Sequence, residues 1–127
     1  MATRRAVLGD EHVDAAIART TAHDEGFQDY LVGAAWADVW SRPGIERSTR
    51  SLITLALLAA LGHELELEMH LRATRRTGAT PEEITEALLH VAVYAGIPAA
   101  NTAFGIMRRV FGDEGVTEGP TDRGPDR

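Results

Sequence analysis

A helix-capping sequence, Thr80-Pro81-Glu82-Glu83, most constrains how this chain folds. The threonine hydroxyl and the glutamate three residues later satisfy free N–H groups at a helix start, and proline suits the first helical position. Apolar residues then recur at helical spacing, and Gly96 and Pro98 mark the end of this helix and the beginning of another. The sequence therefore predicts consecutive helices over 81–95 and from Pro98 to about Phe111.

Apolar periodicity predicts further helices over about 10–20, 24–40 and 46–61. The segment Leu65–Leu71 alternates with period two, as a half-buried strand does, but its residues are strong helix formers and Gly78 supplies a stop, so we predict a helix there too. The predicted fold class is therefore all-α, with one domain over residues 1–111. Residues 112–127 are rich in glycine, proline and charge, and we expect a disordered tail.

Composition excludes several classes of function. The net charge of −6 argues against nucleic acid as a partner. The absence of cysteine excludes disulfides, thiolate metal sites and a cysteine nucleophile. The longest apolar run, Leu52–Leu61, is about half of what a bilayer crossing needs, and the first residues do not form a secretory signal. We expect a cytoplasmic protein with no membrane partner.

Glu66 and His70 lie four residues apart, so they share one face of the predicted helix. A carboxylate in this position can orient an imidazole and raise its basicity, which favours general acid–base catalysis. The simpler alternative is a solvated surface pair worth about 0.5 kcal/mol. His63 lies near the same face, but the spacing matches neither common metal-binding helix pattern, so we expect no metal.

Two other groups are candidates for binding an anion. Arg47 and Arg50 can grip a carboxylate, although they are equally well explained as surface cations. The run Tyr94–Asn101 predicts either a tight helical corner or backbone N–H groups aimed at an oxyanion. Trp36 and Trp40, one turn apart, are most simply core or subunit contacts.

Taken together, these motifs resemble the carboxymuconolactone decarboxylase family of the alkylhydroperoxidase-D-like superfamily. The resemblance covers residues 4–111. Its motifs are Arg4-Arg5-Ala-Val-Leu-Gly9-Asp-Glu-His12-Val, Phe27-Gln28, Trp36-Ala-Asp-Val-Trp40-Ser-Arg42-Pro-Gly, Arg47-Ser-Thr-Arg50-Ser-Leu, Glu66-Leu-Glu-Met-His70, Gly78-Ala-Thr-Pro-Glu-Glu-Ile and Tyr94-Ala-Gly-Ile-Pro-Ala-Ala-Asn101-Thr-Ala-Phe.

The resemblance implies a helical bundle with a central antiparallel helix hairpin, and homo-oligomers that are often hexamers. It also implies cofactor-free decarboxylation of an anionic lactone, 4-carboxymuconolactone, to 3-oxoadipate enol-lactone plus CO2 in protocatechuate degradation, the β-ketoadipate pathway. The peroxidase branch of the superfamily needs a Cys-x-x-Cys pair, which this chain lacks. The alternatives are a related enzyme acting on a different carboxylated lactone and a non-catalytic helical oligomer that binds small organic acids.

The resemblance also suggests roles for the candidate residues. His70, oriented by Glu66, is expected to deliver or relay a proton. The expected substrate-binding residues are Arg47, Arg50, Tyr94, Asn101, Arg5 and His12, the last two from a segment that serves either its own site or that of a neighbouring subunit. His63 and His90 depart from the family pattern, and the sequence assigns them no role.

Overall fold

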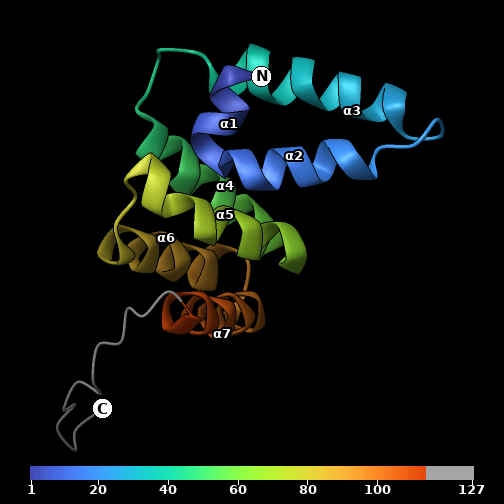
Figure 1. Ribbon diagram of the computed structural model, residues 1–127. Helices are drawn as coiled ribbons and strands as arrows, with labels where there is room; N and C mark the ends of the chain where they lie inside the picture. The colour runs from blue at the N-terminus through green and yellow to red at the C-terminus, as the bar shows by residue number, and fades with distance from the viewer. Residues whose placement is uncertain (114–127) are drawn as a thin grey trace, which may run out of the picture.

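The computed structural model describes residues 1–113, which form helices joined by short connections (Figure 1). In chain order the elements are α1 (Ala2–Leu8), α2 (Asp10–Arg19), α3 (Glu25–Leu31), the π-helix η1 (Val32–Trp40), α4 (Arg47–Leu61), α5 (Glu64–Thr77), α6 (Pro81–Tyr94) and α7 (Ile97–Asp113). The all-α prediction is confirmed. The expected tail, 112–127, lies outside the described residues except for its first two, which end α7.

The predicted capping box is present at the start of α6. The Thr80 hydroxyl accepts a hydrogen bond from Glu83 N at 3.1 Å, and Thr80 N donates to Glu83 Oε1 at 3.0 Å. The ambiguous segment Leu65–Leu71 is helical within α5, and that helix ends at Gly78, which adopts a left-handed conformation. Its helix-forming residues and glycine stop therefore outweigh the period-two pattern.

The main core is built by the last four helices, α4 to α7. α4 and α5 are joined by a tight turn that includes Gly62 and pack against one another as the expected hairpin, while α6 and α7 cover it (Figure 1). The first residues of α4 are tied to the end of α5 by a buried hydrogen bond of 2.6 Å from Ser51 Oγ to Thr77 Oγ1. The core residues are Leu55, Ala59, Leu67, Leu71, Ala79, Ile84, Leu88, Val91, Ala100, Ala103, Ile106 and Val110.

A second, smaller core joins the amino-terminal helices to α5. It contains Val7, Leu8 and Val13 from α1 and α2, the two tryptophans of η1, and Ala73 of α5. Figure 1 shows α2 and α3 as a long hairpin that extends beyond the bundle, with α1 at its base. The sequence predicted neither α1 nor the π-helical winding of η1. Both elements carry residues that position the candidate site.

Candidate active site

The imidazole of His70 packs against a pair of stacked indole rings. Trp36 and Trp40 lie on one face of η1 with ring centroids 5.2 Å apart. The His70 ring stacks at 6.3 Å from the first and 6.0 Å from the second, with an interplanar angle of 13° in each case. Only 7% of the His70 residue is exposed. Packing against η1 therefore fixes the orientation of this imidazole.

Burial determines the charge of His70. Desolvation, followed by the nearby His12, lowers the pKa of His70 from 6.5 to about 4, while Glu66 acts weakly in the opposite direction. The ring is therefore neutral at pH 7, with one nitrogen able to donate and the other to accept. Nδ1 is buried and has no hydrogen-bond partner among the described residues.

The predicted brace between Glu66 and His70 takes a different form from the one expected. Glu66 is exposed on α5, and no hydrogen bond links it to His70 Nδ1. Its influence on the imidazole is limited to its charge. The tryptophans, rather than the carboxylate, hold the ring in place in this chain.

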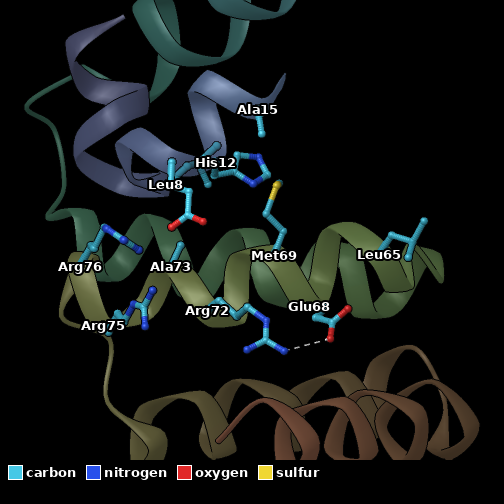
Figure 2. Close-up of a pocket in the computed structure, with 11 residues that line it drawn as sticks. Leu8, His12, Ala15, Leu65, Glu68, Met69, Arg72, Ala73, Arg75 and Arg76 are labelled. Carbon is cyan, nitrogen blue, oxygen red and sulfur yellow. Dashed lines mark hydrogen bonds and ion pairs between the residues drawn. The ribbon is translucent and has the colours of Figure 1, made fainter. Parts of the chain in front are cut away.

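A cleft of about 580 Å³ opens between α2 and α5 (Figure 2), and its lining includes Met69, the residue before His70. His12 projects into it from α2 and faces Met69 of α5. The pKa of His12 is lowered by partial burial and by the charges of Arg4 and Arg19, so this second imidazole also favours its neutral form. His12 therefore lines the cleft, whereas His70 does not line it but is near enough to His12 for its pKa to respond.

The cleft has an excess of positive charge in an otherwise acidic protein. Three arginines and two glutamates line it, whereas the whole chain carries a net charge of −6. The formal charge of the lining is therefore +1, because three arginines outnumber two glutamates. The residues concerned are Arg72, Arg75, Arg76, Glu11 and Glu68.

Two of the cleft's side chains are held by identifiable contacts. Glu68 Oε1 lies 3.3 Å from Arg72 Nη2 and 3.4 Å from Arg109 Nη2 of α7. The Arg76 guanidinium lies over Gly9, where an added Cβ would be only 2.5 Å from Arg76 Nη2. Gly9 also has φ 89° and ψ 150°, a conformation essentially confined to glycine. The turn between α1 and α2 therefore allows α5 to approach closely.

The structure brings His12 and His70 into one region but places the other predicted residues elsewhere. Arg5 donates to Asp10 at 3.1 Å and to Asp14 at 2.8 Å. None of Arg5, Arg47, Arg50, Tyr94 and Asn101 lines the cleft between α2 and α5.

Each of the remaining predicted contacts has its own surroundings. Arg47 begins α4 and is exposed, and Arg50 Nη2 donates to the Arg42 carbonyl at 3.0 Å. Tyr94 is 84% exposed and stacks on His90 at 6.2 Å, and Asn101 is exposed on α7. Among the described residues, no three His, Asp or Glu side chains are grouped so as to hold a metal ion.

Comparison with known proteins now identifies the family. The model of the carboxymuconolactone decarboxylase family matches residues 25–109. The chain belongs to this family. It is 46% identical over 113 residues to 4-carboxymuconolactone decarboxylase of Acinetobacter baylyi, covering 89% of this chain and 84% of that protein. It is 39% identical over 110 residues to the nitrosuccinic acid decarboxylase npaB of Metarhizium robertsii, covering 87% and 77%.

In this carboxymuconolactone decarboxylase family member, sequence reasoning missed the arginines of the cleft. Arg72, Arg75 and Arg76 are spaced three and four residues apart, which places them on one side of α5. That spacing was a usable signal, but the partner element, α2, could not be identified from it. The stacking role of Trp36 and Trp40 was likewise hidden, because it depends on how η1 meets α5.

The depressed pKa of His70 predicts a pH-dependent stability. Its folded-state pKa of about 4 lies below the ordinary 6.5, so the unfolded chain binds the extra proton more readily. The resulting contribution to the free energy of unfolding is present above pH 6.5 and is lost as the pH falls to 4, by roughly 3 kcal/mol. His70→Phe, which keeps a buried ring, should remove this loss in urea denaturation measured across the range.

His23→Phe is the matched control, because His23 is exposed in the connection between α2 and α3. It should retain the wild-type dependence on pH. An identical pH profile for His70→Phe and the wild type would show that His70 does not carry the effect.

Proposed function

We propose that this chain is a carboxy-lyase that converts 4-carboxymuconolactone to 3-oxoadipate enol-lactone plus CO2, in protocatechuate degradation by the β-ketoadipate pathway. The observation that carries the proposal is the 46% identity to 4-carboxymuconolactone decarboxylase of Acinetobacter baylyi across 89% of this chain. The buried imidazole next to a cationic cleft supplies the chemistry that such a reaction needs.

The reaction requires an electron sink, a grip on carboxylates and a proton. The bond between the ring carbon and its carboxylate breaks, CO2 leaves, and the electron pair moves through the conjugated ring to the lactone carbonyl oxygen. A proton then adds to the carbon next to that carbonyl. Because the ring itself accepts the electrons, the proposed reaction uses no cofactor. A well-placed donor to the developing oxyanion contributes on the order of 10²- to 10³-fold in rate.

We assign proton movement to His70 as a relay. A neutral imidazole can accept a proton at one nitrogen while releasing one from the other, without an imidazolium having to persist in a buried site. The charge of Glu66 stabilises the protonated form in passing, since it is the group that raises the pKa of His70. His12, which lines the cleft, connects the relay to bound substrate.

The cleft arginines supply a grip on the substrate's carboxylates in this scheme, because guanidinium groups bind carboxylates with a matched pair of donors. Arg47, Arg50, Tyr94 and Asn101 lie outside this cleft. Their proposed contact with substrate therefore requires a neighbouring copy to bring them to the site. Arg5 already forms ion pairs with two aspartates, so its role at the site is limited to positioning its helix.

We further propose that the chain assembles as a homo-oligomer, with a hexamer as the expected form. α4 and α6 pack side by side and leave large apolar side chains facing outward. Contiguous apolar surface of this kind marks interaction sites, and copies of one chain commonly associate through such faces. We call this set, together with Ile97 at the start of α7, the apolar face. Its residues are 48–84% exposed and comprise Ile53, Leu57, Leu61, Leu89, Val93, Tyr94 and Ile97.

The proposed location is the cytoplasm, which the absence of cysteine favours. Within residues 1–113, no helix combines the length and apolar character needed to cross a membrane.

A direct assay tests the proposed activity. Purified protein should consume 4-carboxymuconolactone with a change in ultraviolet absorbance and release one CO2 per turnover. Nitrosuccinate is the second candidate substrate, favoured by the 39% identity to the Metarhizium robertsii enzyme, and belongs in the same panel. Turnover of nitrosuccinate alone would reassign the substrate. Binding of these acids without any product would indicate the non-catalytic alternative.

Two substitutions test the proton relay. His70→Gln and Glu66→Gln should each lower kcat for 4-carboxymuconolactone, the first by about 10²- to 10⁴-fold, because general acid–base groups contribute that much. Glu64→Gln is a control on the same helix, exposed and in the first turn of α5, and should keep wild-type kcat. If both His70→Gln and Glu66→Gln turn over substrate at nearly the wild-type rate, the assigned role is wrong.

A charge placed in the apolar face should disrupt assembly. Leu57→Glu and Val93→Glu should each lower the molar mass in size-exclusion chromatography with light scattering, because a buried carboxylate without a partner is costly. Glu82→Lys, an exposed charge change in the first turn of α6, should keep the wild-type mass. A monomeric wild-type protein, or unchanged mass in both apolar-face variants, would contradict the proposed interface.

A further inference from the structure

Arg4 is the one arginine in the buried class among residues 1–113. The residue is 5% exposed, and its Nε is buried without a hydrogen-bond partner. No described residue forms a hydrogen bond or an ion pair with its guanidinium. Its neighbour Arg5 differs completely, since two aspartates bind it. The unpaired cation of the amino-terminal segment is therefore Arg4 rather than the predicted Arg5.

A largely buried arginine without a counter-ion, with its Nε fully shielded from solvent, is an unusual feature for a chain to keep. Burial and the charge of Arg5 lower the pKa of Arg4, but a guanidinium stays protonated in proteins under ordinary conditions. A buried charge left without a partner destabilises the fold, whereas an apolar side chain of similar size is often neutral or stabilising. The position therefore lacks a structural reason to be arginine.

Arg4 lines a second cleft, of about 460 Å³, between α1 and the α2–α3 hairpin. Gln28 of α3 lines the same cleft, and its side chain makes no hydrogen bond with the described residues. The hydroxyls of Thr20 and Thr21 are already used, by the Ala16 carbonyl at 3.0 Å and by Asp24 Oδ1 at 2.9 Å. The cleft thus offers a guanidinium and one amide to a ligand.

We propose that Arg4 binds a carboxylate group in this cleft, with Gln28 as the second donor, and that in the proposed decarboxylation it holds a carboxylate of the substrate. The second part rests on the proposed function, and the first part does not. A guanidinium and a carboxylate form paired, charge-assisted hydrogen bonds, and a small acid fits the volume available.

The cleft also contains two acids, Glu25 and Asp29, which bear on this assignment. Both are exposed, and neither is within ion-pair distance of Arg4. Neither carboxylate pairs with the guanidinium, but both line the cleft and repel an entering anion, which makes their removal informative. Glu25→Gln should tighten carboxylate binding if Arg4 attracts the ligand.

Arg4 is also electrostatically connected to the candidate active site. Its charge contributes to lowering the pKa of His12, and His12 in turn affects His70. Arg4 and His12 line different clefts, so this connection acts through charge alone.

Titration calorimetry with succinate as the probe tests the site in the full-length chain. Wild-type protein should bind succinate, and Arg4→Met should weaken binding by about 10- to 100-fold without lowering Tm. Arg4→Lys, which keeps the charge but not the paired donors, should bind with intermediate affinity and remains informative if the methionine variant does not fold. Arg108→Gln, an exposed arginine on α7, should behave as the wild type.

The proposal is overturned if wild-type protein does not bind succinate, or if Arg4→Met, or Arg4→Lys in its place, binds it with wild-type affinity. A separate kinetic assay tests whether Arg4 takes part in the reaction. With 4-carboxymuconolactone, Arg4→Met should raise KM at least tenfold with a smaller change in kcat. Wild-type turnover with an unchanged KM in Arg4→Met removes Arg4 from the reaction and leaves the proposed function standing. If succinate binding depends on Arg4 but the wild type does not turn over 4-carboxymuconolactone, the proposed function is wrong and the carboxylate site at Arg4 stands.

Discussion

The stacking of His70 against the Trp36–Trp40 pair sets the geometry on which the candidate site depends. The imidazole can meet both indole rings only if η1 lies at a fixed depth and rotation against α5. α1 packs on both elements and completes the small core around them. The same contact excludes water from the imidazole and keeps it neutral. Orientation and protonation state therefore have one common cause, which is aromatic packing.

The placement of cations matters more here than their number. The chain has fewer basic than acidic residues, yet arginines gather along one side of α5 and one is buried in α1. Arg5 is neutralised by aspartates of the following helix. Arg4, next to it in sequence, turns inward and has no described counter-ion. Adjacent residues of one type thus have opposite environments, because successive helical positions face different directions.

The helices that carry clear end signals could be predicted from sequence. The capping box at Thr80 and the left-handed Gly78 are local features, so they act without knowledge of the rest of the fold. α1 was missed because Val7 and Leu8 are too few to give a periodic pattern. The π-helical winding of η1 was missed because its residues suit an α-helix equally well.

The sequence pointed to His70 but not to its surroundings. The spacing of Glu66 and His70 predicted an imidazole of raised basicity, whereas the pKa of His70 is lowered. The expected direction relied on a carboxylate four residues away, whereas the observed shift comes mainly from burial by residues about thirty positions earlier in the chain. Contacts between distant segments, such as that of Arg76 with Gly9, follow from the docking of α1 onto α5.

Glu68 gives the bundle a means of adjusting the cleft from a distance. One oxygen of its carboxylate, Oε1, contacts both Arg72 on its own helix and Arg109 on α7. How strongly Glu68 holds Arg72 depends in part on a residue that lies forty-one positions later and does not line the cleft. A substitution at Arg109 can therefore change how Glu68 holds Arg72 while every side chain in the wall of the cleft stays the same.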